Sequence, residues 1–161
     1  MTASYGARTA QVFGEVGIPM EIGAVAVEPF AGLAHVHVAT DAVTEAGGPA
    51  ALSAPAGSAS VTYATLGARF STAIGDGRTR AHAMAVWQHA FNAVTPMTMP
   101  AFAGGDPFAI AGVPIARDTL RLELGVDRAI GDRATASLLY SGRIASGVQD
   151  HGVKGKVAVR F

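Results

Sequence analysis

The sequence predicts an all-β fold, an antiparallel up-and-down meander of about seven strands that forms a partial transmembrane β-barrel. Three observations lead to this fold class. Hydropathy alternates with a period of two in one segment after another, no apolar run is long enough for a membrane-spanning helix, and short turns alternate with long connections. The 161 residues are enough for one domain with a core of its own.

The C-terminal segment shows the alternation most clearly. Its apolar positions are Val153, Val157, Val159 and Phe161, with Gly155 between them. The positions on the opposite face are Lys154, Lys156, Ala158 and Arg160. Because successive side chains of a strand point to opposite faces, one face of this strand is apolar and the other is cationic. Such a strand, ending on an aromatic residue, suits a barrel with lipid outside and water inside.

Six earlier segments carry the same alternation and are expected to be strands. They span residues 10–18, 25–34, 64–71, 80–91, 120–127 and 134–144. In the fifth of these, Leu120, Leu122 and Leu124 alternate with polar residues, whereas a helix would scatter these leucines around its circumference. Glycines on the opposite faces would leave room in a crowded interior or permit curvature of the sheet. They are Gly17, Gly32, Gly67 and Gly125.

The connections differ in length. Short turns are expected near residues 21–24, 75–77 and 131–132, where Gly and Asp supply the backbone conformations of tight hairpins. Longer segments follow the other strands, at residues 40–60, 92–118 and, more modestly, 145–150. Short turns at one end and long loops at the other are typical of outer-membrane barrels. In such a barrel Trp87, Tyr140 and Phe161 would fit the aromatic girdles at the lipid headgroups.

The composition excludes several classes of function. Half of the residues are hydrophobic and 15% are charged, with a mean hydropathy of +0.33 and a net charge of zero, so nothing points to nucleic acid. Cysteine is absent, which excludes disulfides and thiolate zinc sites. Residues 1–8 contain neither the basic nor the apolar region of a signal peptide. Because an outer-membrane protein needs one, we expect the chain to be the C-terminal piece of a longer protein.

The chemical motifs are weak. His35 and His37 share a strand face and could be half of a metal site, but no third ligand is fixed by spacing, although His82, His89 and His151 are available. Placement at a membrane interface explains the pair more simply.

A catalytic triad is also weakly supported. Asp150 and His151 could act with Ser141 or Ser146, but these serines lack a nucleophile elbow or an oxyanion loop. Gly75-Asp-Gly has no calcium-loop partners. No catalytic, metal or cofactor site is therefore predicted, and the chain is not expected to be an enzyme.

Several motifs occur in a recognisable order. They are Gln11-Val-Phe-Gly-Glu-Val-Gly, Glu28-Pro-Phe-Ala-Gly-Leu-Ala, Thr65-Leu-Gly-Ala-Arg, Trp87-Gln-His-Ala-Phe, Phe102-Ala-Gly-Gly, Ile115-Ala-Arg-Asp, Glu123-Leu-Gly-Val-Asp, Tyr140-Ser-Gly, Val148-Gln-Asp-His-Gly and Val159-Arg-Phe. Together they resemble the C-terminal β-domain of classical (type V) autotransporters, over nearly the whole chain. That resemblance implies a barrel of about twelve strands, preceded by a linker helix in the pore and a secreted passenger. Residues 1–161 would carry roughly the last seven strands, without the first strands, the linker helix and the passenger.

The resemblance also implies a location, partners and site residues. The barrel would insert in the lipid of the Gram-negative outer membrane and support export and surface display of a passenger from the same longer chain. The barrel-assembly machinery would read a signal formed by Val153, Val157, Val159 and Phe161. An ion-pair lattice would line the wet lumen, formed by Glu15, Glu28, Arg69, Arg121, Glu123, Lys154, Lys156 and Arg160. In an incomplete barrel the first and last strands would not pair with each other.

Two other readings of the sequence stay open. A soluble antiparallel β-sandwich that binds a partner through its long loops would show the same alternation, although its charged face would then lie outside. A nonfunctional fragment of a barrel is the second alternative. Independence from detergent would favour the soluble module.

Overall fold

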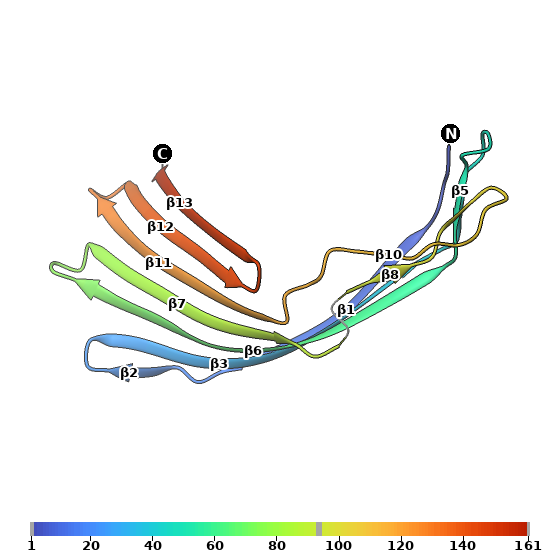
Figure 1. Cartoon of the computed structure of the whole chain (residues 1–161). Helices are drawn as coiled ribbons and strands as arrows, with labels where there is room; N and C mark the ends of the chain where they lie inside the picture. Colours follow the sequence, from blue (N-terminus) through green and yellow to red (C-terminus); the bar gives the residue numbers. More distant parts are fainter. Residues whose placement is uncertain (1, 93–94, 161) are drawn as a thin grey trace. The chain divides into compact units, whose positions relative to one another are not determined.

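The computed structural model describes residues 2–92 and 95–160 and contains β-strands but no helix in these ranges, so no helix there could cross a membrane (Figure 1). Seven of the strands are long. They are β1 (Ala7–Gly17), β3 (Val25–Thr40), β6 (Gly57–Ile74), β7 (Thr79–Ala90), β11 (Asp118–Ile130), β12 (Ala134–Ala145) and β13 (Val148–Val159). The short strands are β2 (Met20–Ile22), β4 (Val43–Thr44), β5 (Leu52–Ala54), β8 (Met97–Thr98), β9 (Ala101–Phe102) and β10 (Ile110–Ala111).

The long strands form one sheet in the order β1-β3-β6-β7-β11-β12-β13, and β2 pairs with β3. Each long strand therefore neighbours the next long strand along the chain, which is an up-and-down meander. This confirms the predicted all-β fold and its antiparallel strands. The order ends at β1 on one side and at β13 on the other, and no pairing between these two strands closes the sheet in the described residues. The expectation of an open, partial barrel is confirmed as well.

The predicted strands are in the right places, but several are longer than predicted, β3 and β6 by the largest amounts. β3 continues to Thr40 and β6 begins at Gly57, so part of the segment expected as a long loop is strand. The residues added to β6 are mostly small or weakly polar, including Ser58, Ser60 and Thr62. Such residues show little hydropathy contrast between the two faces, which is the signal that strand prediction uses.

The last connection differs from the prediction. Residues 145–150 were expected to form a loop, but β12 ends at Ala145 and β13 begins at Val148, so the turn has two residues. Gly147 takes a φ of 74° there, a left-handed conformation that favours glycine. Gln149 and Asp150 are paired strand residues despite their polarity, opposite Ile144 and Arg143. The predicted tight turns are confirmed by Gly23, Gly75, Gly77 and Gly131, which have φ values of 63°, 65°, 77° and 62°.

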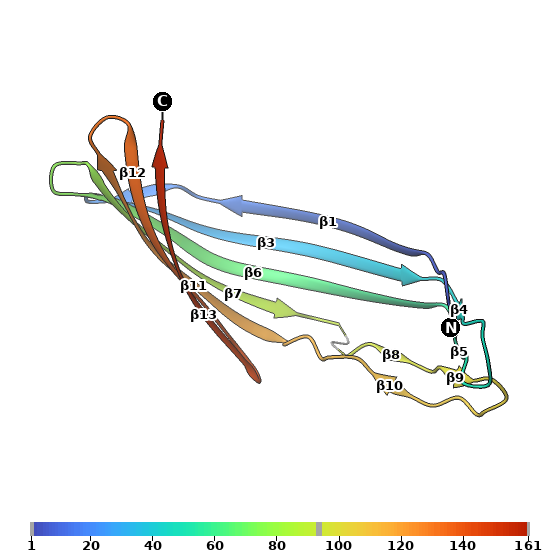
Figure 2. The ribbon, with the colours of Figure 1, turned by 90° about the horizontal axis from the view of Figure 1, so that it is seen from above.

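The chain divides into two compact units. The first comprises Met1–Phe13, Ala34–Tyr63 and Ala90–Ile115, and it contains both long connections. These connections are partly ordered into small sheets, β4-β5-β9 and β10-β8 (Figure 2). Phe102 and Phe108 stack with ring centroids 5.4 Å apart, and Pro100 is fully buried. The long connections predicted after the second and fourth strands are therefore present, and they contain short paired strands that the sequence did not predict.

The second unit comprises Gly14–Leu33, Ala64–His89 and Ala116–Phe161. Four of its strands, β7, β11, β12 and β13, have continuous antiparallel registers. β11 pairs with β12 from Thr119↔Ala145 to Ile130↔Ala134, and β12 pairs with β13 from Ala134↔Val159 to Ala145↔Val148. β11 also pairs with β7, from Asp118↔His89 to Arg128↔Thr79. Because directly opposite residues share a face of the sheet, these registers assign every side chain to one face or the other.

Candidate functional site: an apolar face and a charged face

One face of the second unit is apolar and exposed. The registers place Leu124 between Ala83 and Tyr140, and Tyr140 opposite Val153. Leu124 is 56% exposed and Val153 is 72% exposed. A soluble protein buries a contiguous patch of this kind, so the exposure marks a surface that meets lipid or a partner. We call this surface the apolar face, formed by Trp87, Leu120, Leu122, Leu124, Val126, Leu138, Tyr140, Val153, Val157 and Val159.

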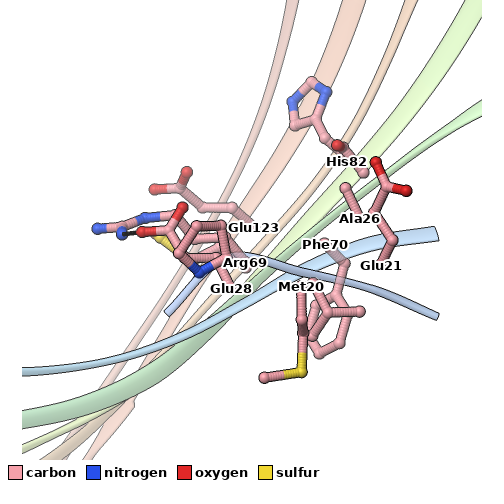
Figure 3. Close-up of a pocket in the computed structure, with 12 residues that line it drawn as sticks. Met20, Glu21, Ala26, Glu28, Arg69, Phe70, His82 and Glu123 are labelled. Atoms are coloured by element: carbon pink, nitrogen blue, oxygen red, sulfur yellow. Dashed lines mark hydrogen bonds and ion pairs between the residues drawn. The ribbon is translucent and has the colours of Figure 1, made fainter. Parts of the chain in front are cut away.

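The other face of the same unit carries most of the charged side chains of the strands. The registers set Glu123 between Met84 and Ser141, and Asp127 between Arg80 and Ser137. In Figure 3, Glu28, Arg69 and Glu123 lie together on one side of the strands. Buried apolar side chains are few, and two of them, Phe30 and Val86, belong to this side. We call this surface the charged face, formed by Glu15, Glu28, Arg69, Arg80, His82, Arg121, Glu123, Asp127, Arg143, Asp150, Lys154 and Lys156.

Arg69 of β6 joins three strands on the charged face. Its Nη2 atom lies 2.8 Å from Oε1 of Glu15 on β1, and its Nη1 atom lies 2.9 Å from Oε1 of Glu28 on β3. The guanidinium carbon lies 3.8 Å from the ring centroid of Phe30, a cation–π contact. Because about two fifths of each charged side chain is exposed, solvent screens the two ion pairs, and their main effect is to fix the position of the guanidinium.

Glycines make room for side chains on the charged face. A Cβ atom at Gly67 would lie 2.5 Å from Cζ of Phe30 and 2.9 Å from the carbonyl oxygen of Ala85. A Cβ atom at Gly17 would lie 2.5 Å from Oε1 of Glu28, and one at Gly125 would overlap the ring of His82. The prediction that these glycines leave space inside a crowded interior is confirmed at the three positions.

A cavity of about 630 Å³ opens beside this cluster (Figure 3). Three carboxylates, those of Glu21, Glu28 and Glu123, form most of its charged lining. Arg69 and His82 also line the cavity. Nδ1 of His82 lies 3.4 Å from Oδ2 of Asp127. The lining holds no serine or cysteine paired with a base, and no group of three or more metal-ligating side chains occurs in the described residues. The arrangement can hold water and cationic groups.

The remaining predicted interior residues are placed differently. Arg121 Nη2 lies 3.6 Å from Oε1 of Glu123 on the same strand. Lys154 and Lys156 stand opposite Leu139 and Ser137, and within the described residues neither lysine has an ion-pair partner. Arg160 follows β13, and its backbone N–H donates to the carbonyl of Arg133. The structure thus brings Glu15, Glu28 and Arg69 together, and Arg121 with Glu123, but leaves the C-terminal cations apart from them.

The two candidate interface aromatics lie at different positions along their strands. Trp87 is near the end of β7, and its Nε1–H donates to Oδ1 of Asp118 over 3.1 Å. His89 Nδ1 lies 2.7 Å from the same oxygen, so the Asp118 carboxylate contacts two side chains of β7. Tyr140 lies opposite Leu124, in the middle of β11, and its hydroxyl is 2.8 Å from Nδ1 of His151. Sequence reasoning missed Asp118, although an acidic residue at the first position of an apolar strand was a usable signal.

The structure separates the residues of the weak triad motif. His151 is opposite Gly142 on the apolar face, whereas Asp150 is opposite Arg143 on the charged face. Ser141 is opposite Gly152, which also puts it on the face away from His151. Adjacent strand residues point to opposite sides, so Asp150 cannot orient the ring of His151 for Ser141. Phe161 of the predicted assembly signal lies outside the described residues.

Comparison with known proteins gives one family and two relatives. A family model described as the autotransporter β-domain matches residues 1–141. Two curated proteins of Serratia marcescens, both named extracellular serine protease, are 38% and 36% identical to the chain over 165 residues. Each comparison covers 99% of this chain but 16% of the relative, so the chain spans a small part of the length of the curated relatives it matches.

Proposed function

The chain belongs to the autotransporter β-domain family, and from this premise we propose that residues 1–161 are the C-terminal part of a translocator barrel. The first strands, the linker helix and the passenger would belong to the same longer polypeptide. Members of the family are translocators of a passenger domain and sit in the outer membrane of Gram-negative bacteria. The observation that carries the proposal is the distribution of the two faces, because Leu124 and Val153 are exposed while Phe30 is buried among charged residues.

The two faces have separate tasks in this function. The apolar face contacts the hydrocarbon of the outer membrane. The hydrocarbon removes these apolar side chains from contact with water, which is favourable. The charged face lines a hydrated passage through which the passenger leaves, and Arg69 with its two carboxylates keeps that passage polar. Export and anchoring need no bond chemistry on a substrate. The two relatives are named as proteases, and that name applies to those proteins. An activity of that kind would belong to a passenger.

The exposed edge of β13 supports a second part of the proposal, namely recognition by the barrel-assembly machinery. Val153, Val157 and Val159 alternate with cationic and small residues and stand on one face, 72%, 69% and 56% exposed. Within residues 2–92 and 95–160, β13 pairs with β12 on one side and with no strand on the other. An unpaired strand edge offers its backbone N–H and C=O groups for strand addition, and the alternate side chains supply specificity.

Replacing Phe161 with alanine, or deleting it, should lower the amount of assembled barrel in the outer membrane. The aromatic ring is the last apolar group of the β13 pattern and would contribute to recognition before any pairing forms. Assembly is measured as the fraction of the full-length protein that runs at its folded position on gels without heating. Ala158→Ser, on the opposite face of β13, is the matched control and should assemble normally. Equal assembly of the two variants would remove Phe161 from the recognition signal.

The membrane location is tested by fractionation of cells that express the full-length polypeptide. We expect the protein in outer membranes, resistant to extraction with urea, and with a mobility on gels that changes on heating. Both properties arise because a closed barrel in lipid satisfies all of its backbone hydrogen bonds internally. Soluble periplasmic protein without a heat-dependent shift would instead support the soluble β-sandwich and overturn the proposal.

A further inference from the structure

We propose that His35 and His37 form a two-histidine binding site for a divalent transition-metal ion such as Cu²⁺ or Zn²⁺ on β3. The residues are separated by one position of a strand, so both side chains stand on the same face, with their Cα atoms about 6.5 Å apart. Both side chains are exposed, so an ion can reach them from solvent. Both histidines, like Ser60 and Thr62, belong to the first compact unit.

Hydroxyl groups of the neighbouring strand hold both rings. Nδ1 of His35 lies 3.0 Å from Oγ1 of Thr62, and Nδ1 of His37 lies 2.8 Å from Oγ of Ser60. A neutral histidine that donates its Nδ1–H to such an oxygen keeps the lone pair of Nε2 for a metal. In the described part of the chain neither Nε2 atom has a hydrogen-bond partner. The two hydroxyl oxygens therefore occupy the outer position at which metal-binding histidines donate their second N–H to an oxygen, and they do so at both candidate ligands.

The chemistry of the donors selects the ion. Imidazole nitrogen suits Cu²⁺, Ni²⁺ and Zn²⁺, whereas Ca²⁺ and Mg²⁺ prefer oxygen ligands. The general affinity order for nitrogen sites puts Cu²⁺ above Zn²⁺. The described residues contain no group of three or more metal-ligating side chains, so water would fill the remaining coordination positions. The site is consequently open, and the bound ion exchanges with solvent.

Cu²⁺ binding to the full-length protein, purified in detergent from outer membranes, tests the proposal. We expect an electron paramagnetic resonance spectrum with nitrogen couplings from two imidazoles. His35→Gln and His37→Gln should each lower the apparent affinity by about tenfold or more, because each converts a chelate into a single ligand. The double variant Ser60→Ala/Thr62→Ala should lower it by about 10- to 100-fold, the usual effect of removing the groups that orient metal ligands.

His151→Gln is the matched control. His151 is also an exposed strand histidine with Nδ1 next to a hydroxyl, that of Tyr140, but it has no second histidine two positions away. Its variant should bind Cu²⁺ like the unaltered protein. Equal affinity of the unaltered protein and a His35→Gln/His37→Gln variant would overturn the proposal, as would an equal loss in His151→Gln. The heat-dependent gel shift, checked in every variant, separates a lost ligand from a lost fold.

Discussion

Leu124→Arg is expected to destabilise the membrane-inserted protein by about 2–4 kcal/mol, the cost of a cation at the middle of a lipid-facing strand. Leu124 is in the middle of β11, on the apolar face, between Ala83 and Tyr140. Its side chain is 56% exposed. If this face were in water, the same substitution would replace an exposed apolar group with a hydrated one and would change the free energy of unfolding little. The sign and size of the effect therefore report which solvent surrounds this face.

The measurement is the free energy of unfolding in lipid vesicles, taken from denaturant titrations of the full-length protein followed by its gel mobility. Ser141→Arg is the matched control, because it adds the same cation on the adjoining strand but on the charged face, opposite Glu123. Its effect should stay within about 0.5 kcal/mol. Equal losses in the two variants would contradict the assignment of the faces, since position on the sheet would then make no difference.

Gly67→Ala is expected to lower the free energy of unfolding by about 1–3 kcal/mol, the usual cost of overpacking. The new methyl group would lie 2.5 Å from Cζ of Phe30 and 2.9 Å from the carbonyl oxygen of Ala85. The ring cannot simply turn away, because it is 6% exposed and Arg69 is stacked on it. The carbonyl belongs to the paired strand β7 and can move only with the sheet.

Gly155→Ala provides the comparison for Gly67→Ala in the same denaturant titration. Gly155 is also in the interior of a long strand, but a Cβ atom there meets nothing within 4 Å. Alanine is a slightly better strand residue than glycine, so this substitution should be neutral or stabilising by a few tenths of a kcal/mol. If both substitutions cost the same, the effect would be a property of glycine in strands, and the close packing of Phe30 over Gly67 would not be its cause.

The sequence predicted the middles of the strands better than their ends. In Leu120–Val126 large apolar side chains alternate with charged residues or glycine, and that contrast comes directly from the two environments of the faces. Around Ser58 and Ser60 the side chains are small on both faces, so the extension of β6 gave no comparable signal. The two-residue turn at Gly147 was missed because Gln149 and Asp150 are polar residues inside a strand.

The candidate site was predictable as a set of faces but not as a set of contacts. Alternation put Glu15, Glu28 and Arg69 on interior positions, and the structure joins these three. The alternation could not show that Lys154 and Lys156 stay apart from the carboxylates, because ion pairing depends on how far apart the strands lie in the sheet. The contact of Trp87 and His89 with Asp118 also depends on register, which one strand alone does not determine.

The two-residue turn between β12 and β13 has a consequence for the order of folding. Together with the turn at Gly131 it makes β11, β12 and β13 one continuous local unit whose registers need no long loop to close. Such hairpins form in about 1–10 μs, whereas pairing β3 with β6 or β7 with β11 must first overcome the entropy of closing the long connections. The C-terminal three strands would therefore form first as a block, with one edge of β13 unpaired, before the rest of the sheet adds to it.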